Sequence, residues 1–281
     1  MSSKNDYFDS DDDESSIPTG ERTVKIKELD LNTLYPRHIG DMKQGAKYII
    51  IGKPGSGKST LIKAILYAKK HIFPCGSAWS GSEDSNGFFG EFMPKLFIYN
   101  GLNVDDLSSQ ERFRERQKIA RKFLEPRKDI SWAFNCVDDC TSDVKFLTKE
   151  VMRDLYKNGR HKALIHLLGL QYCLDIKPDI RVCIDGTFIL RESSPIMRKK
   201  LFENYGSCVE SQADWNELMD QLTTDYMAMF VNNKATSNKL EDCISFIRVD
   251  PDSIPKDWKI GCREYWEFAN ERYDPTSEMR V

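Results

Sequence analysis

A glycine-rich segment in the first quarter of the chain limits what this sequence can fold into more than any other feature. It reads Gly52-Lys53-Pro54-Gly55-Ser56-Gly57-Lys58-Ser59, which fits the pattern G-x-x-x-x-G-K-[ST]. The apolar residues 48–51 come directly before it, and the helical pattern of residues 61–66 comes directly after it. Because the pattern requires this order of strand, loop and helix, we predict a phosphate-binding loop.

The chemistry of such a loop follows from its residue types. Glycines allow the backbone to turn its N–H groups onto phosphate oxygens, and the N-terminus of the following helix adds its positive end. We expect Lys58 to reach the β- and γ-phosphates of ATP, and the Ser59 hydroxyl to ligate Mg²⁺. A glycine-rich turn that holds no ligand is the alternative interpretation.

Apolar segments alternate with helical patterns along the chain. Residues 48–51, 132–137 and 163–170 are strand-like, and a helix is expected over residues 143–156. This alternation predicts an α/β fold of the P-loop NTPase type, with a mainly parallel central sheet flanked by helices.

The last third of the chain has a different pattern. A strand is expected over residues 182–190, and helices over residues 195–205 and 212–222. Residues 226–231 and 243–249 are β-rich, and the segment between them is rich in turn formers. These two runs predict a β-hairpin extension near the C-terminus, at an edge of the sheet.

The charges are unevenly distributed. Residues 1–20 hold one lysine against six acids, a net charge of −5, so with −3 in total the rest of the chain carries +2. A nearly neutral body neither favours nor excludes nucleic acid as a partner. We expect an acidic disordered tail over residues 1–22, a P-loop ATPase domain over 23–250 and a C-terminal extension over 251–281.

Membrane and zinc-binding classes are disfavoured. The longest apolar run, residues 163–170, is far shorter than the ~20 residues that a membrane helix needs, and residues 1–20 do not look like a signal peptide. The eight cysteines are scattered and form no Cys-x-x-Cys. We expect a soluble intracellular protein with no membrane span.

Two acids, Asp138 and Asp139, follow directly after the strand-like residues 132–137. A phosphate loop needs carboxylates on a neighbouring strand, to hold the metal's water shell and to orient the attacking water. We assign Asp138 to Mg²⁺ and Asp139 to the water. The alternative is that the pair only caps the helix expected over residues 143–156. Asn135, a polar residue inside the strand pattern, is left without a role.

Gln171 and Arg160 flank the strand expected over residues 163–170. Gln171 lies at its C-terminal end, where ligands bind in parallel sheets, and can hydrogen-bond a γ-phosphate oxygen and the attacking water. Arg160 lies before the strand, on the side of its own sheet opposite the nucleotide, so it could serve a neighbouring subunit's γ-phosphate in a ring. A surface ion pair is the alternative for Arg160, and Arg181 is a rival for the same role.

Taken together, these motifs resemble those of the genome-packaging ATPases of nucleocytoplasmic large DNA viruses, the poxvirus-type branch of the FtsK/HerA superfamily. The similarity runs in order over residues 34–249 and includes residues 83–87, 158–161 and 226–243. The nucleotide-binding segment of the resemblance extends from Gly52 through Ser59 to Thr60. The family's Walker B acids correspond to Asp138 and Asp139, its sensor glutamine to Gln171 and its trans-acting arginine to Arg160. Many FtsK/HerA members have Asp-Glu where this chain has Asp138-Asp139.

The resemblance implies a motor that hydrolyses ATP with Mg²⁺ and translocates viral double-stranded DNA into a preformed capsid. It also implies a homo-oligomeric ring, capsid or portal-like partners, and a place in the virion or at the viral assembly site in the cytoplasm of the infected cell.

The residues by themselves leave two other functions open. A small-molecule phosphotransferase of P-loop type would use Lys58 and Asp138 equally well. A structural virion protein could hold nucleotide without hydrolysing it, although Asp139 and Gln171 argue against that reading. GTP specificity is disfavoured because the chain has no Asn-Lys-x-Asp motif.

Overall fold

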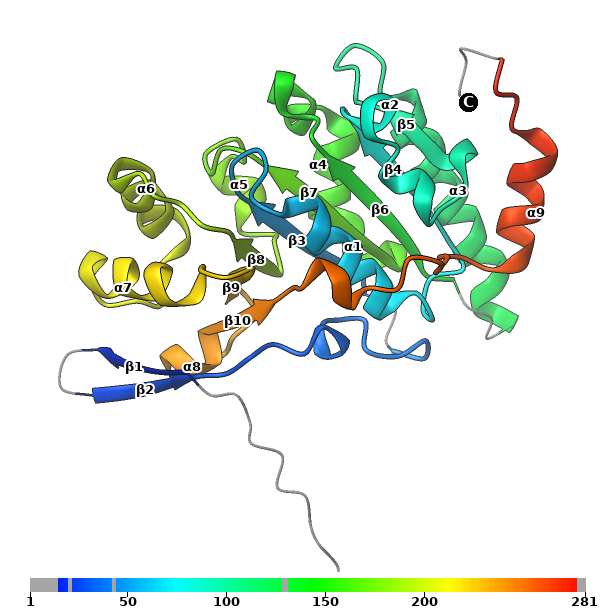
Figure 1. Cartoon of the computed structure of the whole chain (residues 1–281). Helices are drawn as coiled ribbons and strands as arrows, with labels where there is room; N and C mark the ends of the chain where they lie inside the picture. Colours follow the sequence, from blue (N-terminus) through cyan, green and yellow to red (C-terminus); the bar gives the residue numbers. More distant parts are fainter. Residues whose placement is uncertain (1–14, 20–21, 42–43, 128–130, 277–281) are drawn as a thin grey trace, which may run out of the picture.

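An eight-stranded, mostly parallel sheet forms the centre of the molecule, with helices on both faces (Figure 1). The computed structural model describes residues 15–19, 22–41, 44–127 and 131–276. The strand order is β10-β9-β8-β3-β7-β6-β4-β5, and within this sheet only β9 runs in the direction opposite to the other strands. This arrangement confirms the predicted α/β fold with a mainly parallel sheet. The strands are β3 (Ala46–Ile51), β4 (Cys75–Ser80), β5 (Ile98–Asn100), β6 (Ala133–Asp138), β7 (Leu164–Leu170), β8 (Gly186–Ile189), β9 (Met227–Asn232) and β10 (Ile244–Arg248).

Two apolar cores fill the space between the sheet and its helices, one on each face. Successive side chains of a strand point to opposite faces, so Ile49 and Ile51 of β3 belong to one core while Tyr48 and Ile50 belong to the other. The helices are α1 (Lys58–Lys69), α2 (Glu83–Asn86), α3 (Ser108–Leu124), α4 (Glu150–Asn158), α5 (Pro178–Arg181), α6 (Pro195–Tyr205), α7 (Gln212–Leu222), α8 (Leu240–Cys243) and α9 (Arg263–Arg272). Among the residues described, no helix is long and apolar enough to cross a membrane.

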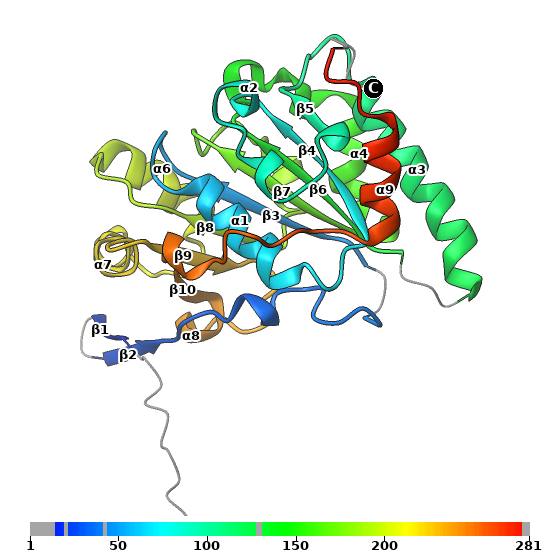
Figure 2. The ribbon, with the colours of Figure 1, turned by 45° about the vertical axis from the view of Figure 1, so that its right-hand side comes forward.

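The helices α3, α4, α6 and α7 pack against the core that contains Ile49, whereas α1 and α9 pack against the core that contains Ile50. Figure 2 shows α9 running along the same side of the molecule as α3. The C-terminal segment is tied to the sheet by the Tyr265 hydroxyl, which donates a hydrogen bond of 2.8 Å to the Gly76 carbonyl.

The predicted β-hairpin is present at one edge of the sheet. Strands β9 and β10 pair antiparallel, and β9 also pairs antiparallel with β8. Residues 27–29 lie along β10, where the Leu29 N–H donates to the Phe246 carbonyl at 2.6 Å and the Phe246 N–H donates to the Lys27 carbonyl at 3.2 Å. These bonds cover part of an edge that would otherwise be open to another strand.

The acidic tail predicted over residues 1–22 lies largely outside the described residues. Within that range Ser15–Thr19 forms β1, which pairs antiparallel with β2 (Arg22–Ile26) as a ribbon beside β10 (Figure 1). The division of the chain at residues 22 and 250 stays a prediction.

Two expected elements differ from the structure. The strand expected over residues 182–190 is shorter, because the chain leaves α5 through a turn and β8 begins only at Gly186. There the Asp185 carboxylate accepts the Lys47 N–H at 2.7 Å. The helix expected over residues 143–156 is broken at Lys149, which has an extended backbone (φ −70°, ψ 150°) between the 3-10 segment Thr141–Thr148 and α4.

A row of buried polar side chains crosses the middle of the sheet and accounts for Asn135. Lys47, His166, Asn135 and Ser77 are register neighbours on β3, β7, β6 and β4, and each is at most 2% exposed. Asn135 Nδ2 donates to Gln110 Oε1 at 3.0 Å, so Asn135 Oδ1 is free to accept from His166 Nδ1, 2.8 Å away.

His166 Nε2 then accepts from the Tyr156 hydroxyl at 2.9 Å. This set of bonds requires a neutral imidazole with its proton on Nδ1. Burial favours the same state, because it lowers the pKa of His166 to about 3.

The buried histidine makes stability depend on pH. Its pKa is near 6.5 in the unfolded chain and lower in the folded protein, so between these values the unfolded state binds more protons. Stability should therefore fall as the pH drops below about 6.5, with this residue contributing up to ~1.4 kcal/mol per pH unit. Urea unfolding at pH 5 and 7.5 should show a smaller pH effect in His166→Gln than in the parent. Substituting the exposed His71 by Gln is the control, and an equal loss of pH effect in both variants would contradict the assignment.

Candidate functional site

The glycine-rich segment forms the loop between β3 and α1, as the sequence predicts. Gly55 and Gly57 have φ values of 73° and 98°, a left-handed conformation that glycine adopts without steric cost. The loop is fastened at its start by a hydrogen bond of 3.0 Å from the Gly52 N–H to the carbonyl of Leu170, the last residue of β7. The loop therefore lies at the carboxyl end of the parallel strands, where α/β proteins bind ligands.

Lys58 begins α1 and folds back over the loop. Its Nζ donates to the carbonyls of Gly52 and Lys53, at 2.9 and 3.0 Å. Burial lowers the pKa of Lys58, and the negative charges of Asp138 and Asp139 oppose this effect. The ammonium group is therefore held at the loop, where it interacts with the two acids at the end of β6.

Ser59 of α1 and Asp138 at the end of β6 meet although one strand, β7, separates β3 from β6. The Ser59 hydroxyl donates to Asp138 Oδ2 at 2.6 Å, and the Asp138 side chain is buried. Within the described part of the chain, Asp138 Oδ1 has no hydrogen-bond partner. Burial raises the pKa of this carboxyl, while the Ser59 hydrogen bond and the Lys58 charge lower it. A buried carboxylate oxygen without a partner, beside a hydroxyl, fits the oxygen ligands that Mg²⁺ takes.

Gly169 makes room for this carboxylate. It lies on β7, the strand between β3 and β6, and a Cβ built there would overlap Asp138 Oδ1. We did not single out Gly169 from the sequence, although a glycine inside a strand is a known signal for the close approach of another group.

Asp139 and Gln171 come together at the ends of β6 and β7. Gln171 Nε2 donates to Asp139 Oδ1 at 3.0 Å, and both side chains are exposed. Asp139 has a φ of 53°, which turns the chain sharply after β6. The 3-10 segment that follows has Cys140 as its N-cap residue, with no hydrogen bond from the cap side chain. The structure thus gives no support to the alternative in which the two acids cap this helix.

Arg160 lies at the opposite end of β7, in the 3-10 turn Gly159–Lys162. Its side chain is 49% exposed, and its Nη2 is 3.4 Å from Oδ1 of the buried Asp185. Lys234 Nζ lies 3.0 Å from the same oxygen. Asp185 is therefore shared between two cations, one of which is the candidate arginine.

Arg181 is held by its own subunit. Its guanidinium donates to Asn204 Oδ1 at 2.6 Å and to the Ile176 carbonyl at 2.9 Å, and it lies over the Tyr205 ring. These contacts give Arg181 a structural role in joining α5 to α6.

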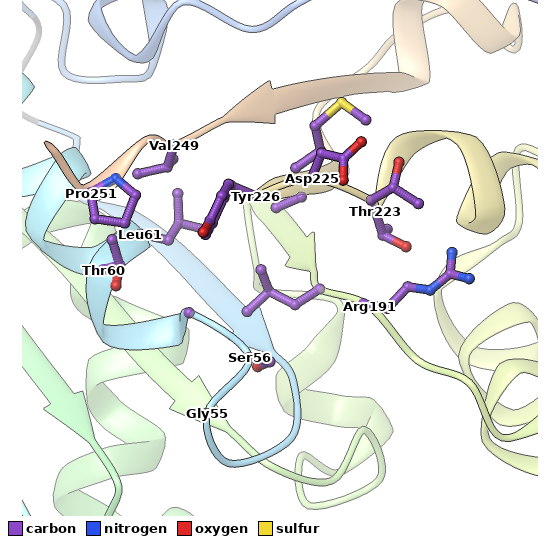
Figure 3. A pocket seen from close by; sticks show the side chains of 15 residues that line it. Gly55, Ser56, Thr60, Leu61, Arg191, Thr223, Asp225, Tyr226, Val249 and Pro251 are labelled. Atoms are coloured by element: carbon purple, nitrogen blue, oxygen red, sulfur yellow. The ribbon is translucent and has the colours of Figure 1, made fainter. Parts of the chain in front are cut away.

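A cavity of about 510 Å³ lies beside the loop (Figure 3). Its walls come from the loop and α1, from Leu190 and Arg191 after β8, from residues 223–226 between α7 and β9 and residues 227–228 at the start of β9, and from Val249 and Pro251 after β10. Outside the loop and Thr60, the sequence predicts no nucleotide-binding role for these residues, because segments so far apart in the chain carry no common pattern.

The chain is similar to proteins of large DNA viruses. It is 39% identical over 259 residues to the uncharacterised protein 088R of Invertebrate iridescent virus 3, with 91% of this chain and 97% of the relative covered. Protein 015R of Frog virus 3 (isolate Goorha) is 36% identical over 248 residues, with 88% and 75% covered. No protein-family model matches the chain.

Among solved structures, the genome packaging NTPase B204 from Sulfolobus turreted icosahedral virus 2, in complex with AMPPCP, aligns with a TM-score of 0.50. The alignment covers 72% of this chain and 96% of B204, at 15% sequence identity. At this identity the likeness establishes a shared fold.

The space beside Asp138 can be tested with one methyl group. Gly169→Ala should displace the Asp138 carboxylate from Ser59, because both cannot occupy the same volume. We expect a loss of stability of about 1–3 kcal/mol from overpacking, and weaker Mg²⁺-dependent binding of ATP in the fraction that folds. Calorimetry with and without Mg²⁺ measures the second effect. Gly40→Ala, where a Cβ meets nothing within 4 Å, is the control; unchanged Mg²⁺ dependence in folded Gly169→Ala would refute the role of Asp138.

Proposed function

We propose a function for this chain on the premise that it belongs to the genome-packaging ATPase family of nucleocytoplasmic large DNA viruses, within the FtsK/HerA superfamily. It is an ATP-driven motor that moves viral double-stranded DNA into the capsid. The observation that supports the proposal most is the 2.6 Å hydrogen bond between Ser59 and Asp138, because it brings together the hydroxyl that follows the phosphate loop and the strand-end acid, the two groups that would bind Mg²⁺.

The residues of the site divide the work of hydrolysis. The loop amides and Lys58 bind the phosphates, and Ser59 and Asp138 hold Mg²⁺. When bound there, the metal would supply positive charge beside the phosphates. Asp139 orients the attacking water and accepts its proton, while Gln171, hydrogen-bonded to Asp139 at 3.0 Å, positions that carboxylate and contacts the γ-phosphate.

A ring of subunits completes each site in this proposal. Arg160 lies at the end of β7 opposite the loop, so it cannot reach the phosphates of its own subunit. Its guanidinium is half exposed even though Nη2 lies 3.4 Å from the Asp185 carboxylate, so its outer side can face a neighbour. Arg181 is tied to Asn204 and Ile176 of its own chain, which favours Arg160 for the role in trans.

Membership of the packaging-ATPase family suggests the partners of the motor. Double-stranded DNA passes along the ring, and capsid or portal-like components receive it at the viral assembly site or in the virion. The two iridovirus relatives support a viral setting.

Hydrolysis of ATP should increase when long duplex DNA is added at fixed ionic strength. Asp139→Asn should keep ATP bound but slow hydrolysis about 100-fold or more, because the group that accepts the water's proton is lost, so it serves as the blank. Asp105→Asn, at an exposed site outside the loop, is the matched control. If long duplex DNA does not change the rate of ATP hydrolysis in protein shown to be assembled, the motor function is rejected and a small-molecule phosphotransferase is favoured.

If the active species is a ring with Arg160 acting in trans, the inactive variants Arg160→Ala and Lys58→Ala should complement each other. Arg160→Ala lacks the arginine but has an intact loop, and Lys58→Ala has the reverse defects. In an equal mixture about one quarter of the interfaces should pair an intact loop with an intact arginine, so hydrolysis should return. Mixing Lys58→Ala with Asp138→Asn is the control, since both defects affect the same side of the interface. If Arg160→Ala and Lys58→Ala co-assemble without recovery, Arg160 does not act in trans.

A further inference from the structure

The position of Ser59 and Asp138 relative to the cavity determines which way a bound nucleotide would point. Ser59 and Asp138 mark the end of the phosphate loop that holds the metal and the γ-phosphate, and this end faces β7 and β6. Since a nucleoside triphosphate is a linear chain from γ-phosphate to base, its nucleoside must extend in the other direction, toward β8, β9 and β10. The cavity beside the loop lies on that side.

The part of the cavity next to α1 is mostly apolar. Thr60 and Leu61 form one wall, and Leu190, Val249 and Pro251 form others. Figure 3 shows the Tyr226 ring directed into the cavity from the turn between α7 and β9, on the side where Leu61 lies. A slot with these walls suits a flat aromatic base.

Tyr226 is unusual in both its backbone and its exposure. Its φ is 64° and that of Asp225 is 48°, values that bulky residues rarely adopt. The conformation is held by hydrogen bonds from the Val249 N–H to the Tyr226 carbonyl, at 3.0 Å, and from the Met227 N–H to the Thr224 carbonyl, at 2.8 Å. Tyr226 is nevertheless 74% exposed. A glycine would fit this backbone more easily, so an exposed tyrosine here points to a role beyond the fold.

Two polar side chains nearby, Arg191 and Thr223, are bonded to residues of α7. Arg191 Nη1 donates to the Met219 and Asp220 carbonyls, each at 3.3 Å, and pairs with the Asp220 carboxylate. The Thr223 hydroxyl donates to the Met219 carbonyl. Arg191 and Thr223 are therefore anchored to the end of α7, whereas the face of the Tyr226 ring is exposed and can stack on a base.

We propose that Tyr226 is the stacking wall of a purine-nucleoside subsite and determines the base preference of the site. This inference rests on the proposed function, because it assumes that the loop binds a nucleoside triphosphate. A purine presents a larger face to the ring than a pyrimidine does, so ATP and GTP should bind similarly and both should bind more tightly than CTP.

The test uses a substitution that suits the backbone and removes the ring. Tyr226→Gly should weaken MgATP binding about 10-fold, in line with the energy of stacking a base on an aromatic side chain. Binding of Mg²⁺ with inorganic tripolyphosphate, which has no nucleoside, should not change. Tyr226→Phe should bind ATP like the parent. Val182→Ala, at an exposed apolar position before β8, is the control, and melting curves verify that each variant is folded.

The possible outcomes distinguish a failure of the Tyr226 subsite from a failure of the proposed ATPase function. Unchanged ATP affinity in Tyr226→Gly, an equal loss for ATP and tripolyphosphate, or a parent that binds CTP as tightly as ATP would overturn the subsite while leaving the phosphate loop intact. A parent that binds neither ATP nor tripolyphosphate would overturn the proposed function, and the subsite with it.

Discussion

The hydrogen bond between Ser59 and Asp138 is the contact on which the site depends. It joins residues 79 positions apart, and it forms because β3 and β6 lie on either side of β7 and all three strands run in the same direction. Parallel strands bring their carboxyl ends to one edge, so the loop after β3 and the acids after β6 face each other. Gly169, on the strand between them, leaves the space that the Asp138 carboxylate occupies.

The sheet separates two sets of charged groups, one at each of its ends. The loop and its acids lie at the carboxyl end, and Arg160, Lys234 and the buried Asp185 lie at the other. If Arg160 serves a second site, two copies must meet through different surfaces, and repeating such a contact with closure gives a ring. Between these ends, hydrogen bonds of the buried His166 and Asn135 link β7 and β6 to α4 and α3.

The antiparallel pair β9 and β10 does more than extend the sheet. It begins and ends beside the phosphate loop, so it carries Tyr226 and Pro251 to the cavity next to α1. Residues 27–29 cover the outer edge of β10, which limits pairing with other chains. The β9–β10 pair thus extends the sheet and also supplies a wall of the cavity.

The sequence alone determined the features that depend on local order. The phosphate loop needs only its glycines, Lys58 and Ser59 between a strand and a helix, and the acids at 138 and 139 needed only an apolar run before them. Helices 195–205 and 212–222 were predicted with their observed bounds for the same reason. The structure alone decided what depends on distant contacts: the break at Lys149, the late start of β8, the space at Gly169, the hydrogen bonds of Asn135, and the cavity that Leu61, Leu190 and Tyr226 share. Each of these needs residues from separate elements to occupy one place, and a pattern read along the chain carries no information on which strands become neighbours.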